Sequence, residues 1–122
     1  MDWFVRRFVK ASLVWFALGM SLGVFMTVRP ALIVYRPAHV HMNLLGFVSM
    51  MIFGVAYHVI PRFTGHPLHS RRLAGAHWWL SNAGLALLVA GFALTVSFRN
   101  EIRLVLIAGG LLSTAGGAAF IV

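Results

Sequence analysis

Histidines at both ends of one apolar segment are the residues of this chain best suited to do chemistry. His39 and His41 open a segment that runs from about residue 38 to residue 60. His58 lies near its other end, about 25 Å from His41 along a helix axis. Neutral imidazole binds metal ions and is the usual axial ligand of haem iron. Because a histidine inside a membrane span is uncommon and costly, it marks a candidate functional site.

A haem held between membrane helices needs an inward-facing imidazole, small residues beside its flat ring and cations for its propionates. His41 lies about one turn inside the outer boundary, Gly46 follows it, and Arg29 and Arg36 flank the outer end. His39, two residues away, points to a different face of the helix. Because His41 lies deeper, we expect it to be the axial ligand. The alternative is an interfacial histidine bonded to a backbone carbonyl.

The second axial ligand of such an iron stays open. His77 begins a later segment on the inner side, too far from His41 for one chain to clamp one haem between them. A two-fold dimer would supply His41 from each protomer, and two-fold symmetry is the commonest in oligomers. Met26 is the other candidate. A five-coordinate iron would favour gas binding over electron transfer.

The remaining histidines gather near the inner end. They are His58, His66, His69 and His77. Such a set could bind zinc or copper, or His58 and His77 could hold a second haem on the inner side. Neighbouring arginines disfavour a cation, and no carboxylate lies near enough in sequence to orient the imidazoles. The alternative is an ordinary interfacial loop.

Composition places the chain among integral membrane proteins. Of its 122 residues, 61% are hydrophobic and 10% are charged, against about 25% charged in soluble domains. The absence of cysteine excludes disulfides and thiolate metal sites. A net charge of +8 would suggest nucleic acid for a soluble protein. Here the basic residues separate apolar runs, so we expect the lipid bilayer as partner and no nucleic acid.

We predict a single all-α domain that crosses the membrane four times. The expected spans are residues 8–28, 38–60, 74–97 and 102–122. Pro61 should close the second span, because proline disfavours helix at and before its position. The link 31–35 should lie in the membrane interface. Small residues should form helix-packing faces, at Gly19 and Gly23 and again between residues 109 and 117.

Polar side chains inside the spans have simpler expectations. Asn43 should hydrogen-bond to backbone or a neighbouring helix, or support the His41 side. Asn82 should bond between helices. Tyr57 should anchor the chain at the membrane interface, and the alternative is a role in a proton or electron path.

The distribution of Lys and Arg predicts orientation, because cytoplasmic loops carry the excess. One side would hold Arg6, Arg7, Lys10, Arg62, Arg71 and Arg72. The other would hold Arg29, Arg36, Arg99 and Arg103. We therefore expect a multi-pass protein of the cell inner (cytoplasmic) membrane with both termini cytoplasmic and His41 near the outer surface.

Two runs in the second segment resemble the second transmembrane helix of subunit I of the haem–copper oxidase superfamily, nearest the nitric oxide reductases and C-type oxidases. The runs are Arg36-x-x-x-x-His41-Met42-Asn43-Leu44-Leu45 and Phe53-Gly54-Val55-Ala56-Tyr57-His58-Val59-Ile60-Pro61. That branch carries a His-Thr-Asn-Leu-Leu-like start and a Gly-x-x-Tyr-Tyr-x-x-Pro-like end. The resemblance implies a subunit-I-like bundle in which His41 is an axial ligand of a low-spin haem b.

The departures shape the expected function. Met42 replaces the threonine, His58 replaces the second tyrosine, and four spans omit the helices that carry the family's other ligands. We therefore expect no binuclear centre, and b-type haem binding for electron transfer in a respiratory context, in a homo-oligomer with an unknown redox partner. The alternatives are a non-catalytic accessory or assembly subunit, a haem-based gas sensor, and a metal-binding membrane protein that uses the inner histidines.

Overall fold

A computed structural model describes residues 2–67, 70–94 and 103–121, which are helical apart from short links. The elements are α1 (Trp3–Val28), the 3₁₀ helix η1 (Pro30–Tyr35), α2 (Arg36–His41), the π-helix η2 (Met42–Ser49), α3 (Met50–Thr64), α4 (Arg71–Leu94) and α5 (Arg103–Ile121). Four rods are long and apolar enough to cross a membrane: Trp3–Val28, Pro30–Thr64, Arg71–Leu94 and Arg103–Ile121. The predicted all-α class with four spans is confirmed.

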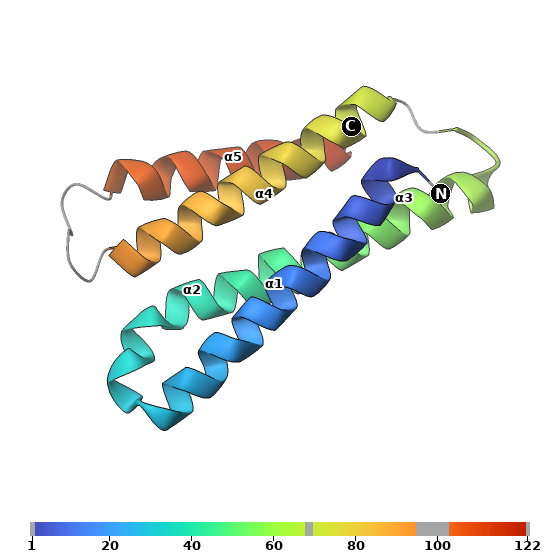
Figure 1. The fold of residues 1–122 in the computed structure, drawn as a ribbon. Helices are drawn as coiled ribbons and strands as arrows, with labels where there is room; N and C mark the ends of the chain where they lie inside the picture. The colour runs from blue at the N-terminus through green and yellow to red at the C-terminus, as the bar shows by residue number, and fades with distance from the viewer. Residues whose placement is uncertain (1, 68–69, 95–102, 122) are drawn as a thin grey trace.

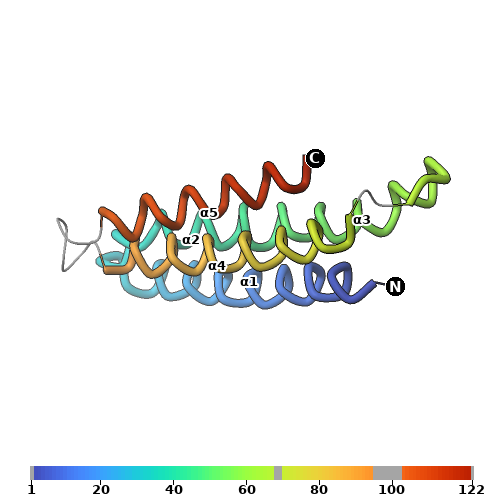
Figure 2. The backbone as a smooth tube through the Cα atoms, turned by 90° about the horizontal axis from the view of Figure 1, so that it is seen from above, coloured from blue at the N-terminus to red at the C-terminus, as the bar shows by residue number. Residues whose placement is uncertain are grey.

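The rods form two antiparallel pairs that lie side by side (Figures 1 and 2). In one pair α1 packs along η2 and α3, and in the other α4 packs along α5. Helix α4 joins the pairs, since it also contacts α1, α2 and η2. The start of α1 and the end of α5 lie at the same end of the bundle (Figure 1).

The second rod begins earlier and ends later than the sequence predicts. The link 30–35 is a 3₁₀ helix that runs directly into α2. The prediction that Pro61 closes the rod is wrong, because α3 continues through Pro61 to Thr64. Proline there removes only one backbone donor close to the helix end, which is tolerable. The stop is Gly65, whose φ of 70° is left-handed and whose N–H donates to the Pro61 carbonyl at 3.0 Å.

Small residues allow close helix approach, as the sequence predicts. A Cβ on Gly19 would lie 2.6 Å from the Asn43 amide, and one on Gly23 would lie 2.8 Å from the His39 ring. At the α4–α5 contact, the corresponding positions are Gly84, Gly109 and Gly116, which meet Ser113, Leu88 and Ser81 respectively.

A polar bond crosses the bundle between α1 and α4. The indole N–H of Trp15 donates to Oδ1 of Asn82 at 3.1 Å, which confirms the bond between helices expected of Asn82. The Asn82 amide in turn donates to the Trp78 carbonyl at 2.9 Å. The Trp15–Asn82 bond therefore links the two helical pairs.

Candidate functional site

His41 lies half-buried where α2 meets η2, at the end of the bundle opposite the chain's first residues. Its Nδ1 donates to the Pro37 carbonyl at 2.7 Å, which is the backbone bond named in the alternative expectation for His41. Its ring packs against Phe92 of α4 with centroids 4.8 Å apart. A carbonyl oxygen only accepts, so Nδ1 must carry the proton and Nε2 keeps its lone pair. The geometry leaves the nitrogen that would bind a metal without a hydrogen bond in the described part of the chain.

His39 faces the other way, as its two-residue offset predicts. Its Nδ1 donates to the Gly19 carbonyl of α1 at 2.8 Å. The Asn43 side chain donates to the His39 backbone carbonyl at 2.9 Å. Of the two expectations for Asn43, the structure thus shows the backbone bond, on the His39 side. His39 and Asn43 together connect α2 to α1, and His41 stays on the side of α4.

The cationic residues expected around His41 lie at the same end of the bundle. Arg29 caps α1 and Arg36 begins α2, and both are exposed. Neither guanidinium has an ion pair or hydrogen bond within the described residues. Both charges are therefore available to an anionic group at this end.

Gly46 is placed differently from the other expected site residues. A Cβ there would lie 2.4 Å from Cβ of Trp15 and 3.1 Å from Leu85. Its missing side chain therefore admits neighbouring helices in this structure, and the space beside it is filled by protein.

A small cavity lies deeper in the bundle, between η2, α3, α4 and α5. Its volume is about 120 Å³, and its lining is Leu45, Ser49, Met50, Phe53, Ser81, Ser113 and Gly117. The Ser113 hydroxyl is buried and has no hydrogen-bond partner in the part of the chain that the structure describes. Drug-sized ligand pockets measure about 300–1,000 Å³, so this cavity is too small to enclose a porphyrin.

At the end of the bundle that holds the start of α1, His77 forms the polar centre of an aromatic cluster. It is 0% exposed, and its ring contacts Phe8, Phe53 and Phe120 at centroid distances of 4.9, 4.5 and 5.7 Å. Its Nδ1 lies 2.7 Å from the Tyr57 hydroxyl, and its Nε2 is buried without a partner among the described residues. Tyr57 is 8% exposed, so the expectation of an interface anchor is wrong. The sequence signal for this burial was the aromatic pair Phe53 and Tyr57, which are four residues apart and so lie on the same face of the helix.

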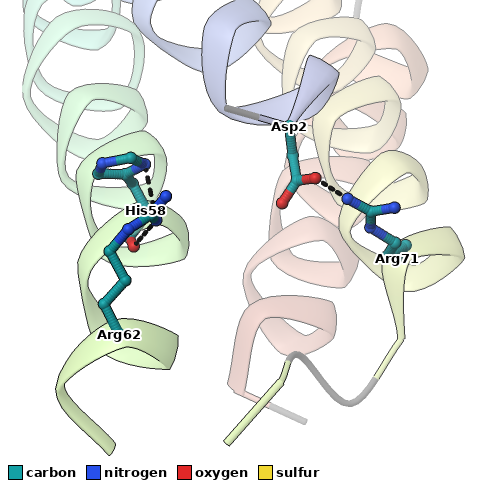
Figure 3. A network of polar contacts seen from close by, with 4 residues as sticks. All are labelled: Asp2, His58, Arg62 and Arg71. Atoms are coloured by element: carbon teal, nitrogen blue, oxygen red, sulfur yellow. Dashed lines mark hydrogen bonds and ion pairs between the residues drawn. The ribbon is translucent and has the colours of Figure 1, made fainter. Parts of the chain in front are cut away.

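The other inner histidines have separate partners. One guanidinium nitrogen of Arg62 donates to His58 Nδ1 at 3.0 Å and to the His58 carbonyl at 2.7 Å (Figure 3). His66 Nδ1 donates to the Thr64 carbonyl at 2.8 Å. His69 lies outside the described residues. Within the described ranges, no group of three His, Cys, Asp or Glu side chains could hold a metal ion. His58 and His77 likewise have different partners, an exposed arginine and a buried tyrosine.

Comparison with known proteins gives consistent matches over most of the chain. A profile of the family described as Cytochrome C and Quinol oxidase polypeptide I matches residues 7–98. The Cbb3-type cytochrome c oxidase subunit CcoN1 of Stutzerimonas stutzeri is 33% identical over 92 residues, covering 70% of this chain and 19% of the relative. Cytochrome c oxidase subunit 1 of Rhodobacter capsulatus is 36% identical over 58 residues, covering 47% of this chain and 11% of the relative.

The chain thus spans about a fifth of the length of the first relative and about a tenth of the second. No solved structure gives a significant match.

Proposed function

The chain belongs to the family Cytochrome C and Quinol oxidase polypeptide I, and from that premise we propose that it binds a b-type haem with His41 as an axial ligand. The matched region includes His41, and both relatives are named as cytochrome c oxidase subunits. The observation that carries the proposal is the free lone pair of His41 Nε2. The bond from Nδ1 to the Pro37 carbonyl selects the tautomer that an iron ligand needs.

The Pro37 carbonyl has a second effect on the imidazole. Metal-binding histidines usually donate their other ring N–H to a carbonyl or carboxylate, which fixes the ring and raises the basicity of the ligating nitrogen. His41 has this arrangement within its own helix turn. The exposed guanidinium groups of Arg29 and Arg36 would pair with the haem propionates, since Arg binds carboxylates in a two-pronged geometry.

A single chain gives His41 only partial cover. The side chain is half-buried, and the nearby cavity is too small for the ring. We infer that a second copy completes the site and supplies its own His41 from across a two-fold axis. With both imidazoles bound, the iron would have no open position for a gas.

We propose electron transfer in a respiratory context, in the cell inner membrane, with the redox partner unknown. Haem would supply a one-electron iron couple, and the protein's residues would position it and hold its charge. An accessory or assembly role without cofactor is the rival proposal.

The test is an absorption spectrum of protein purified from cells supplied with haem, oxidised and reduced. We expect a Soret band, about one haem per two chains, and no shift with carbon monoxide. His41→Ala should abolish the band, and the matched variant His39→Ala should keep it if the bundle still folds. Circular dichroism of both variants separates ligand loss from unfolding.

Each contrary result has a distinct meaning. Colourless wild-type protein would overturn haem binding and favour the accessory role. A band that survives in His41→Ala would overturn the ligand. One haem per chain with a carbon monoxide shift would replace the shared site with an open iron, as in a gas sensor.

A further inference from the structure

A groove lies at the inner end of the bundle, between the start of α1 and the first turns of α4. Its volume is about 310 Å³, and its lining is Trp3, Arg71, Arg72, Gly75 and Trp79. The groove is separate from His41, which lies at the opposite end. It therefore needs an explanation of its own.

The groove runs along the membrane-spanning direction. Arg71, Gly75 and Trp79 are spaced four residues apart and so lie on one face of α4. Trp79 lies about 12 Å further into the span than Arg71. A Cβ on Gly75 would lie 2.9 Å from the Trp3 ring, so the glycine allows Trp3 to form one wall. The groove is therefore charged at its mouth and lined by aromatic side chains further into the span.

The mouth of the groove carries an excess of positive charge. Asp2 forms an ion pair with Arg71 and so holds that guanidinium in place (Figure 3). Arg7 stacks over Trp3 at 5.3 Å from the ring centroid. Arg72 is exposed and has no ion pair or hydrogen bond within the described residues. The lining thus contributes two guanidinium groups, Arg71 and Arg72, against the single carboxylate of Asp2.

The aromatic walls of the groove also offer a free hydrogen-bond donor. Trp3 and Trp79 are 48% and 60% exposed, and the Trp79 indole N–H has no acceptor within the described part of the chain. Indole rings with one polar edge collect at the level of lipid headgroups. The groove therefore offers a charged donor at its mouth and a neutral donor about two turns deeper.

We propose that this groove binds the headgroup of an anionic phospholipid. Arg72, aided by Arg71, takes the phosphate, because guanidinium and phosphate form strong charge-assisted hydrogen bonds. The Trp79 N–H donates to an ester carbonyl below it, and the acyl chains continue along the apolar side of the bundle. Basic pockets between membrane helices are suited to such headgroups. This site does not depend on haem binding at His41.

The test measures thermal unfolding of the detergent-solubilised full chain against added lipid. We expect phosphatidylglycerol to raise the midpoint more than phosphatidylcholine with the same acyl chains, and inorganic phosphate to have little effect. Arg72→Gln should weaken the apparent affinity for phosphatidylglycerol about tenfold, the size expected for a lost charge-assisted hydrogen bond. Trp79→Phe should weaken it less, since it removes only the neutral donor.

Arg103→Gln is the matched control, because Arg103 is also exposed at the start of a helix but lies at the other end of the bundle. We expect it to bind phosphatidylglycerol like the wild type. If Arg72→Gln fails to fold, Arg72→Lys, which keeps the charge but loses the planar fork, should show a smaller loss. Equal losses in Arg103→Gln and Arg72→Gln, or equal protection by phosphatidylcholine, would overturn the site. Equal protection by inorganic phosphate would overturn the lipid as its ligand.

Discussion

The Tyr57 hydroxyl and His77 Nδ1 lie 2.7 Å apart, and both side chains are buried where α3 faces α4. Phe8, Phe53 and Phe120 pack against the His77 ring. Within the described residues, His77 Nδ1 has no other hydrogen-bond partner than the Tyr57 hydroxyl. The bond therefore favours one rotation of α3 relative to α4 over its neighbours.

Tyr57→Phe should lower the free energy of unfolding by about 1–3 kcal/mol, because it leaves the buried His77 nitrogen without a partner. Denaturant titration in detergent micelles would measure the change. Tyr35→Phe is the control, since Tyr35 has no hydrogen bond in the described ranges, and it should change the free energy by less than about 0.5 kcal/mol. Equal effects of the two substitutions would contradict this role of the pair.

Gly46→Ala should destabilise the bundle by about 1–3 kcal/mol, because the added methyl group would collide with Trp15. Gly110→Ala adds the same group at a helical position with nothing within 4 Å. It should be neutral or slightly stabilising, since alanine favours helix over glycine. Thermal unfolding of both variants is the measurement, and a tolerated Gly46→Ala would contradict the close contact.

The Trp15–Asn82 bond should give a small but measurable coupling. A double-mutant cycle with Trp15→Phe and Asn82→Ala isolates it from the separate losses of packing. Hydrogen bonds between membrane helices average about 0.6 kcal/mol in such cycles, and we expect a value of that order. A coupling energy indistinguishable from zero would show that the contact does not hold the helical pairs together.

The Asp2–Arg71 ion pair should contribute little to folding, because the Arg71 side chain is 73% exposed. Asp2→Asn should change the unfolding free energy by less than about 1 kcal/mol, and the difference should shrink as salt is added. The Asp2→Asn substitution should instead change the affinity for anionic lipid, because loss of the carboxylate leaves the groove more positive. Unfolding curves at low and high salt would reveal a larger effect if one exists.

Hydropathy and the placement of small residues allowed the sequence to predict much of the fold. Four apolar runs predict four spans, and small residues such as Gly19 and Gly109 predict where helices approach closely. Pro61 misled the prediction of the second helix end, because a proline close to a helix end disturbs few bonds. The actual stop, Gly65, follows it by four residues.

The site was harder to predict, because neighbours in space decide what a side chain does. Spacing alone separates His39 from His41, and the structure agrees. Spacing could not indicate that Trp15 fills the space beside Gly46. Nor could it indicate that Tyr57 turns inward to His77, since that contact joins residues on two different helices.

The π-helical stretch Met42–Ser49 has a consequence for how this rod evolves and is engineered. Each π turn holds about one residue more than an α turn, so the stretch acts as an angular spacer between His41 and Tyr57. Deleting one residue there would turn the inner half of the rod by about 100° against the outer half. The imidazole at one end and the phenol at the other could then no longer both meet α4. The directions of His41 and Tyr57 thus depend on the number of residues between them as well as on their contacts with neighbouring helices.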